Sequence, residues 1–406
     1  MTLSRRGQRL VESPPFPDYL HEHFARRAAP SEPGHEYVPL CVAENLLLGD
    51  RLMERLAAVP PPPTSVLAYD AMVGSEHFRQ RLASFLGHRV LGRPCPPEHL
   101  AVLGGAGSVL EIVFHNLCDP GDGVLVPTPS YAGFWADLET RDQLNIVPVH
   151  TRADDGFQLT PELLDRAMAE AARPVKALLL TTPDNPRGKV YTREELEIVL
   201  AWAEHKQLHV VVDEIYALSI HGDQPFVSAA QLSPTLGDHV HIVWAFSKDF
   251  GASGLRCGVL VTENQDLVQA TDALAYWACV SGHTQHLLAE LLGDTPWLDA
   301  YIQENQSILR QAYKKVTTAL DAQGISHVPA GAGFFLLCDL RQYLDAPTWD
   351  AEQALWRKIL EQSNVNLTPG SACRVGEPGF MRLCFAAVES DVVVGAVERM
   401  GEVVGG

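Results

Sequence analysis

Lys248 stands directly after a predicted buried strand, the apolar run at 241–246, and a glycine-punctuated segment follows it. A lysine amine that loses its proton on desolvation becomes a nucleophile able to form a Schiff base. Arg256, eight residues later, carries a fork of donors that suits a phosphate dianion. The stretch therefore indicates Schiff-base chemistry beside a phosphate. Taken alone, however, a lysine after a strand is most often a solvated loop residue.

A glycine-rich turn offers a candidate phosphate site. Gly105, Ala106 and Gly107 follow the predicted strand at 100–103 and open a predicted helix. Free backbone N–H groups and the positive end of the helix dipole make such a turn an anion-binding site. A glycine turn by itself is a weak signal, so its meaning depends on the residues after the other strands.

Polar residues also follow two further predicted strands. Asn185 lies between two prolines after the strand at 177–180. Asp213 and Tyr216 follow the strand at 209–212. Each has an ordinary alternative, because Asn is a common turn former and Asp at a strand end often caps a helix. Ligands of open α/β sheets bind beyond the carboxyl ends of strands, so these residues together predict one shared site.

The elements that must position these residues are nearly continuous apolar strands alternating with helices. This pattern is typical of an α/β fold with a mostly parallel sheet covered on both faces. The seven expected strands lie at 100–103, 124–126, 146–149, 177–180, 209–212, 242–246 and 259–261. We therefore expect the site at one edge of a seven-stranded sheet in a large domain.

The order of the elements predicts two domains. The expected divisions are an N-terminal arm with part of the small domain at 1–63, the large domain at 64–300, and a smaller α+β domain at 301–406. A long predicted helix at 297–322 could bridge the domains. The proline-rich first 35 residues, which include Pro30 and Pro33, predict an irregular arm with one short helix near 19–27. We expect this arm to wrap a neighbouring subunit.

Composition narrows the function classes. The 406 residues are 46% hydrophobic and carry a net charge of -19, with a pI near 5.2. Nucleic acid and anionic membrane surfaces would repel such a protein, so neither is an expected partner. The sequence has no run of about 18 apolar residues and no apolar segment behind its start, which indicates the cytoplasm. The eight cysteines form no C-x-x-C pair, so we expect neither a disulfide framework nor a metal site.

The residues after three strand ends resemble the aminotransferase class I/II group of pyridoxal-phosphate enzymes, which have fold type I. They are Asn185-Pro186-Arg187-Gly188, Asp213-Glu214-Ile215-Tyr216, and Ser247-Lys248 with Arg256. Within this group the sequence is similar to the 1-aminocyclopropane-1-carboxylate synthase family. The motifs that carry this similarity are Ala43-Glu44-Asn45, Gly104-Gly105-Ala106, Val126-Pro127-Thr128-Pro129, Tyr131, Gly133-Phe134, Ser247-Lys248-Asp249, 366–371 and 382–386.

The resemblance implies pyridoxal 5'-phosphate as the cofactor and gives catalytic roles to three residues. Lys248 would hold the cofactor as a Schiff base and then act as the base at the substrate Cα. Asp213 would pair with the pyridinium nitrogen and keep the ring an electron sink. Tyr216, together with Asn185, would hydrogen-bond the phenolic oxygen of the cofactor. Tyr131 would stack on the ring.

The resemblance also implies phosphate and substrate contacts. The cofactor phosphate would be bound by Gly105, Ala106, Gly107, Ser247 and Arg256. Tyr69 would reach the phosphate of a neighbouring subunit, which implies a homodimer with shared active sites. Arg382 would clamp the substrate α-carboxylate with two parallel hydrogen bonds, near Asn185 and Tyr131. Glu44 would offer an anion to the substrate, although a charge or cap at a helix start is its ordinary explanation.

Two positions depart from the family's pattern. The family has a hydroxyl residue three positions before the lysine, where this chain has Ala245, so we expect one phosphate contact to be missing. In the synthases an Asp and an Arg follow the Gly-Phe pair, whereas Trp135 and Ala136 stand here. The second change leaves the identity of the substrate or product open.

The leading interpretation is an enzyme that binds S-adenosylmethionine, removes the Cα proton and expels methylthioadenosine from Cγ. The product would be aminocyclopropane carboxylate, or a vinylglycine-type intermediate captured by another reactant. The alternative is an aminotransferase of an α-amino acid, which shares every cofactor contact. Glu44 separates the two, because an anion there favours a sulfonium substrate. A cofactor-binding transcription regulator would need a DNA-binding domain, and the first 60 residues show no basic helical module.

Overall fold

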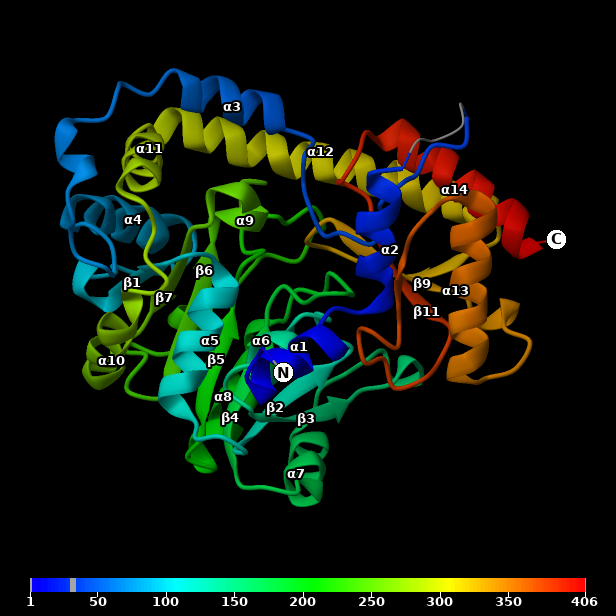
Figure 1. Cartoon of the computed structure of the whole chain (residues 1–406), viewed down its shortest axis with the longest axis horizontal. Helices are drawn as coiled ribbons and strands as arrows, with labels where there is room; N and C mark the ends of the chain where they lie inside the picture. The colour runs from blue at the N-terminus through cyan, green and yellow to red at the C-terminus, as the bar shows by residue number, and fades with distance from the viewer. Residues whose placement is uncertain (1, 30–33, 406) are drawn as a thin grey trace.

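The larger of two sheets organises the protein. The computed structural model describes residues 2–29 and 34–405 (Figure 1). Seven strands lie in the order β1-β7-β6-β5-β4-β2-β3, with β7 antiparallel to β1 and β6 and the other pairs parallel. The strands are β1 (Leu100–Leu103), β2 (Gly123–Thr128), β3 (Asn145–His150), β4 (Val175–Thr181), β5 (His209–Asp213), β6 (Val240–Ala245) and β7 (Gly258–Val261). The predicted α/β fold with a mostly parallel seven-stranded sheet is confirmed.

Both faces of this sheet are covered because its strands are apolar at consecutive positions. In β5, Val211 packs into one core and Val212 into the other, since successive side chains point to opposite faces. The face of Val211 is covered by α5 (Ala106–Leu117), α6 (Phe134–Glu139) and α10 (Gln265–Ala275). The face of Val212 is covered by α4 (Glu76–Arg89), α7 (Pro161–Glu170), α8 (Arg193–His205) and α11 (Gly282–Leu292). Side chains of α3 (Gly49–Ala57) join the second core.

One long helix, α12 (Thr295–Ala322), joins the two parts of the structure. Near its start Leu298 and Tyr301 pack into the core of the large sheet. Further along, Leu309 and Val316 pack into the core of the smaller sheet. Because a helix is stiff over this length, α12 fixes the orientation of the two cores relative to each other.

The smaller sheet is antiparallel, with strands in the order β10-β11-β9-β8. Its elements are β8 (Ser326–Val328), β9 (Phe335–Asp339), β10 (Thr368–Pro369), β11 (Phe380–Cys384), α13 (Trp349–Ser363) and α14 (Ser390–Gly405). The core of this part also includes Tyr216 and Ala245. The last residue of β6 and a residue that follows β5 therefore pack in the same core as the smaller sheet. Within the described residues, no helix combines the length and apolar character that a membrane span requires.

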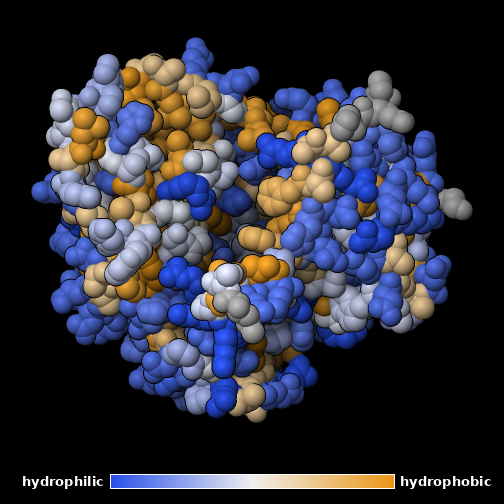
Figure 2. Space-filling view, viewed as in Figure 1, coloured by the Kyte–Doolittle hydropathy of each residue, from blue (hydrophilic) through white to orange (hydrophobic). Residues whose placement is uncertain are grey.

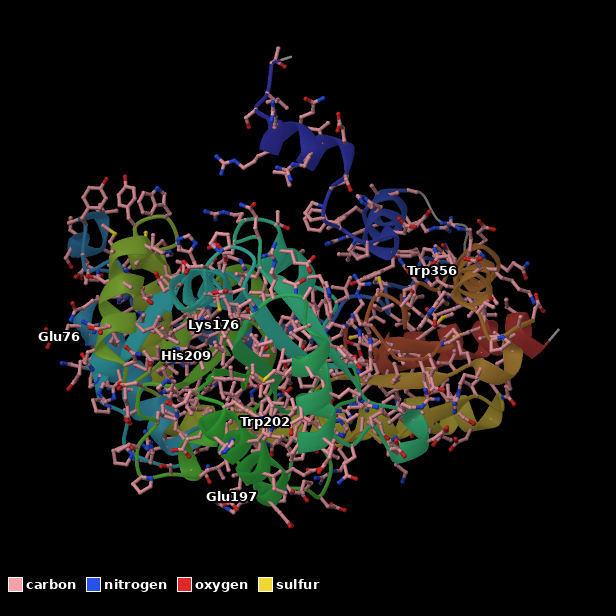
Figure 3. The ribbon with its side chains drawn as sticks, turned by 90° about the horizontal axis from the view of Figure 1, so that it is seen from below. Glu76, Lys176, Glu197, Trp202, His209 and Trp356 are labelled. Carbon is pink, nitrogen blue, oxygen red and sulfur yellow. The ribbon has the colours of Figure 1, made fainter. Side chains whose placement is uncertain are left out.

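The N-terminal arm differs from its prediction. It contains two helices, α1 (Arg5–Glu12) and α2 (Asp18–Arg27), where one was expected. α1 is initiated by the Ser4 hydroxyl, which accepts a hydrogen bond from the Gly7 N–H at 3.2 Å. The prolines that suggested an irregular arm follow this helix rather than interrupt it. No residue of α1 is buried, and the helix projects from the rest of the chain in Figure 3; Pro30 and Pro33 lie outside the described residues.

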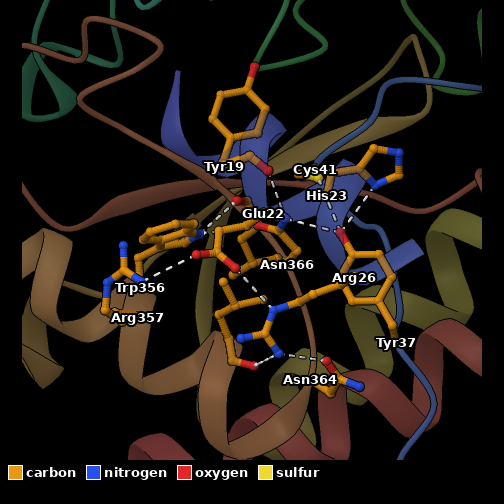
Figure 4. Close-up of polar contacts among 12 residues, drawn as sticks. Tyr19, Glu22, His23, Arg26, Tyr37, Cys41, Trp356, Arg357, Asn364 and Asn366 are labelled. Atoms are coloured by element: carbon orange, nitrogen blue, oxygen red, sulfur yellow. Dashed lines mark hydrogen bonds and ion pairs between the residues drawn. The ribbon is translucent and has the colours of Figure 1, made fainter. Parts of the chain in front are cut away.

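The second arm helix is anchored to the small-sheet part (Figure 4). Asn366 Nδ2 donates to the carbonyl of Tyr19 at 2.9 Å, and Arg26 donates to Asn364 Oδ1 at 3.0 Å. The Tyr19 side chain is itself buried. The start of α2 is therefore part of the small core and holds a fixed position.

Candidate active site

Lys248 lies in the short helix α9 (Phe246–Asp249) that directly follows β6. Its Nζ donates to the backbone carbonyl of Ala43 at 2.6 Å. Burial lowers the pKa of the lysine to about 8, and the nearby Arg382 guanidinium acts in the same direction. A larger share of this amine is therefore neutral near pH 8 than for an exposed lysine, as nucleophilic chemistry requires.

Asp249, the next residue, was named in the sequence only as part of a motif, yet it supports the lysine. Its carboxylate accepts hydrogen bonds from Trp244 Nε1 at 2.9 Å, from the Leu218 N–H at 3.1 Å and from Ser219 Oγ at 2.7 Å. Burial raises the pKa of Asp249 to about 7. The carboxylate thus ties the lysine helix to β6 and to the segment that follows Tyr216.

Asp213 occupies the end of β5, as predicted, and is buried. One carboxylate oxygen accepts from the Ile215 N–H at 3.2 Å, and burial raises the pKa of Asp213 to about 7. The neighbouring Glu214 points elsewhere, accepting from Ser228 Oγ at 3.0 Å and from the Ala229 N–H at 2.7 Å. Among the described residues one N–H donates to the Asp213 carboxylate, whereas Glu214 accepts two hydrogen bonds on Oε1 and its buried Oε2 has no partner.

Asn185, Tyr216 and Arg382 come from three distant segments and form one buried network. Asn185 Nδ2 donates to Tyr216 Oη at 3.1 Å, and Arg382 Nη1 donates to Asn185 Oδ1 at 3.1 Å. Arg382 Nη2 donates to the Cys41 carbonyl and to Thr368 Oγ1. Among the described residues, no acceptor pairs with the buried Arg382 Nε. The network places a guanidinium beside two groups that can hydrogen-bond an oxygen.

The glycine turn and Arg256 form a tight cradle at the start of α5. Gly105 has a φ of 100°, and a Cβ on it would lie 2.5 Å from Arg256 Nη2. Arg256 Nη2 donates to the Gly104 carbonyl at 3.3 Å. A Cβ on Gly258 would lie 2.5 Å from the Gly105 carbonyl carbon. The predicted phosphate residues therefore meet in space, with free helix N–H groups beside a guanidinium.

Ala245 lies at the other side of this cradle. It pairs with Gly258 in the sheet register and is fully buried. Without a hydroxyl, its side chain has no donor to offer an anion. The neighbouring Ser247 is buried in the first turn after the strand.

Glu44 and Tyr131 approach the same region from other segments. The Glu44 carboxylate accepts from Ser253 Oγ at 3.3 Å, and its carbonyl accepts from the Cys384 thiol at 3.5 Å. Because Glu44 follows Ala43, it is one residue from the carbonyl that Lys248 contacts. Tyr131 is 38% exposed and packs edge-to-face on Phe134 with ring centroids 5.3 Å apart. Figure 2 shows a hollow between the large-sheet and small-sheet parts.

Tyr69 is the predicted site residue that the structure does not bring to this cluster. It is 91% exposed and lines a surface cavity of about 420 Å³ together with Met72, Phe78 and His286. No hydrogen bond joins it to the other predicted site residues in the described part of the chain. As for metals, no cluster of three or more His, Cys, Asp or Glu suited to an ion occurs among residues 2–29 and 34–405.

Comparisons with known proteins identify the family to which this chain belongs. The profile of the family "Aminotransferase class I and II" matches residues 38–400. The chain belongs to this family of pyridoxal-phosphate-dependent enzymes. It is 35% identical to 1-aminocyclopropane-1-carboxylate synthase 6 of Arabidopsis thaliana, over 89% of this chain and 77% of the relative. It is 34% identical to 1-aminocyclopropane-1-carboxylate synthase of Malus domestica, over 91% of this chain and 82% of that relative.

Solved structures agree with the fold. An aspartate aminotransferase from Thermus thermophilus with maleate superposes with a TM-score of 0.81 at 23% identity, covering 99% of this chain and 100% of that chain. A further relative, 1-aminocyclopropane-1-carboxylate synthase-like protein 1 of Arabidopsis thaliana, is 33% identical over 96% of this chain and 83% of its own length. The predicted class I/II membership, fold type I and similarity to the synthases are thereby confirmed.

The residues present fit pyridoxal phosphate. Lys248 is a buried amine with a lowered pKa, and the cradle of Gly105 and Arg256 leaves no room for a Cβ. Asp213 is a buried carboxylate at a strand end. An aldehyde, a phosphate and a ring nitrogen each find a chemically suitable group.

Proposed function

We propose that the enzyme acts on S-adenosylmethionine and releases methylthioadenosine from Cγ after Cα deprotonation. The observation that carries the proposal is the Glu44 carboxylate, one residue from the carbonyl that holds Lys248 Nζ. A sulfonium places a positive charge next to Cγ, and a carboxylate or an aromatic face stabilises such a charge. Similarity to the 1-aminocyclopropane-1-carboxylate synthases supports the same substrate.

The site residues suit the binding of an α-amino acid. Arg382 would take the substrate carboxylate, using its fork of donors and the Nε that has no partner in the described chain. Asn185 and Tyr216 already form a hydrogen-bonded pair beside it. Because the guanidinium is buried, an anionic partner there would be strongly favoured over water.

Pyridoxal phosphate, when bound, supplies an aldehyde for Lys248 and a ring that withdraws electrons from Cα. Lys248 would take the Cα proton on Nζ, because burial lowers its pKa to about 8 and so favours the neutral amine that can accept a proton. Asp213 would remain an anion facing the ring nitrogen. The electron pair left on Cα would form the bond to Cγ as the Cγ–S bond breaks with its electron pair on sulfur, so the sulfonium would leave as neutral methylthioadenosine.

A homodimer with shared sites is part of the proposal. Tyr69 and Leu67 are 91% and 84% exposed and line one cavity, and Tyr276 and Trp277, at 61% and 74%, shortly precede Cys279 in the wall of that cavity. Large exposed aromatic groups of this kind mark protein interfaces. A two-fold partner would cover them and place Tyr69 near the partner's phosphate cradle.

The deciding experiment incubates the purified holoenzyme with S-adenosylmethionine and follows methylthioadenosine by mass spectrometry. We expect its release by the wild type, a large loss of rate in Glu44→Gln with cofactor content retained, and no release by Lys248→Ala. Glu54→Gln, an exposed acid in α3, is the matched control and should behave as the wild type.

The aminotransferase alternative gives the opposite result. Methylthioadenosine would never form, even with candidate co-substrates present. Amino acids would instead convert the cofactor to its pyridoxamine form at catalytic rates. That outcome would replace the proposed function while leaving the family membership intact.

A further inference from the structure

A cavity of about 370 Å³ adjoins the proposed substrate residues. Its wall includes Phe16 and Tyr19 from the arm, Trp135 from α6, Gln353 from α13, and Ser371 and Arg374 from the turn after β10. Most of this surface is aromatic or apolar. None of the roles proposed above uses it.

The cavity lies close to the substrate end of the candidate site, because Tyr19 in its wall is within electrostatic reach of Arg382 and Tyr131. The Ser130 N–H, next to Tyr131, donates to the carbonyl of Cys373 at 2.9 Å. The turn that carries Arg374 directly follows Thr368, whose hydroxyl accepts from Arg382 at 3.0 Å. A substrate held at Arg382 can therefore extend toward this turn.

Trp135 stands where the motif after Gly133-Phe134 departs from that of the synthases. The Arg374 guanidinium lies over its indole ring, 5.0 Å from the centroid. Arg374 is held in a left-handed conformation with a φ of 54°, and its N–H donates to the Ser371 carbonyl at 3.1 Å. The neighbouring Ala136 is small where the synthases have arginine. The indole therefore has the guanidinium over its ring and the cavity beside it.

We propose that this cavity binds the adenosine part of S-adenosylmethionine, with Trp135 as the stacking surface and Arg374 as a positioning residue. The inference rests on the proposed function. A purine offers a flat face to the indole, while its amino group and the ribose hydroxyls need polar partners. Gln353, Ser371 and Asp18 in the wall can supply them. The volume lies within the range of ligand cavities, about 300–1,000 Å³.

Charge supports this ligand over an anionic one. The wall contains the Asp18 carboxylate as well as the Arg374 guanidinium, and Glu139 lines the neighbouring cavity that shares Trp135 and Arg374. A second anion would meet these carboxylates, whereas adenosine is uncharged. The arm side of the cavity is preformed, because α2 is tied to the small-sheet part by Asn366 (Figure 4).

Titration calorimetry with methylthioadenosine on the holoenzyme tests the site without requiring turnover. We expect Trp135→Ala to raise the dissociation constant for methylthioadenosine by about fivefold to a hundredfold, the range for loss of one base-aromatic stack. Trp135→Phe should retain most of the affinity, and Arg374→Ala should show an intermediate loss that Arg374→Lys partly restores. Trp349→Ala, in the neighbouring cavity only, is the matched control. The absorbance of the bound cofactor should be the same in all five variants as in the wild type.

Failure of this inference and failure of the proposed function give different results. No binding of methylthioadenosine to the wild type, or equal binding to Trp135→Ala, overturns the adenosine site even if methylthioadenosine is released from S-adenosylmethionine. Binding that depends on Trp135 without such release supports the site and overturns the proposed function. If both hold, Trp135→Ala should raise the KM for S-adenosylmethionine more than it lowers kcat.

Discussion

Asp249 gives the sharpest test of how the lysine is positioned. Its buried carboxylate accepts from Trp244 Nε1, the Leu218 N–H and Ser219 Oγ, all within 3.1 Å. Asp249→Ala removes both acceptor oxygens, and with them three hydrogen bonds, and leaves the donors buried. A buried donor without a partner costs about 1–3 kcal/mol. The serine hydroxyl can rotate to another acceptor, so we expect a loss of about 3–5 kcal/mol in the free energy of unfolding.

Asp249→Asn separates hydrogen bonding from charge. The amide oxygen can accept from Trp244 and Leu218, and the amide nitrogen can donate to Ser219 Oγ. The asparagine should therefore keep the fold and the lysine position. Any change that it causes reports the charge alone.

The pH dependence has a definite sign. Burial raises the pKa of Asp249 to about 7 from an ordinary value near 3.8. Between these values the folded state binds more protons than the unfolded state, so this residue lowers stability as pH rises. Between pH 3.8 and pH 7 the free energy of unfolding falls by about 1.4 kcal/mol per pH unit on account of Asp249, and above pH 7 this contribution no longer changes. The asparagine variant lacks this contribution, so its stability relative to wild type should increase from pH 4 to pH 7.

Urea denaturation of the apoprotein and both variants at pH 5 and pH 8 measures these quantities, with cofactor affinity as a second readout. Asp249→Ala should also weaken cofactor binding, because Lys248 sits in the same short helix. The hydrogen-bond argument is tested at pH 5, where most of the pH-dependent cost of the carboxylate is absent: a loss below about 1 kcal/mol there in Asp249→Ala would refute it, since even one unpaired buried donor costs that much. An identical pH dependence in Asp249→Asn and wild type would refute the charge argument.

Three further outcomes follow from the site and the exposed surface. Arg382→Ala should raise the KM of any α-amino acid substrate by an amount equivalent to about 2–5 kcal/mol, and a normal KM in steady-state kinetics would show that another group binds the carboxylate. Gly105→Ala should lower cofactor affinity at least tenfold in equilibrium dialysis, because its Cβ would lie 2.5 Å from Arg256 Nη2. Gly49→Ala serves as the control, since a Cβ on Gly49 meets nothing within 4 Å. Light scattering should give a dimer that Trp277→Asp dissociates; a fully active wild-type monomer would exclude shared sites.

The candidate site was largely predictable because its residues follow strands that apolar runs in the sequence identify. Asp213 directly follows an apolar run, Lys248 stands two residues after one and Asn185 five residues after one, and parallel strands bring their carboxyl ends to one edge. The support given by Asp249 was not predictable in the same way. Its donors come from β6 and from the segment after β5, and only the folded chain brings these together.

β10 and α1 have no internal hydrophobic periodicity, and the sequence did not reveal either element. β10 has only two residues, too few for an alternating pattern. α1 has no buried residue, so no apolar stripe marks it, and its main signal is the single Ser4 cap. In both cases the information that defines the element is a hydrogen-bonding partner rather than a hydrophobic pattern.

The same burial that tunes the site also destabilises it without a ligand. Burial raises the pKa of Asp213 to about 7 and lowers the pKa of Lys248 to about 8, because both charged forms lose hydration. For Asp213 this makes the apoprotein less stable as pH rises from about 4 to 7. A protonated ring nitrogen beside Asp213 would lower the pKa of Asp213 again. The stability of the protein would then no longer fall with pH on account of this residue. We therefore expect the melting temperature of the wild type to fall less between pH 5 and pH 7 with cofactor than without it. Equal slopes would show that Asp213 does not meet a cation in the holoenzyme.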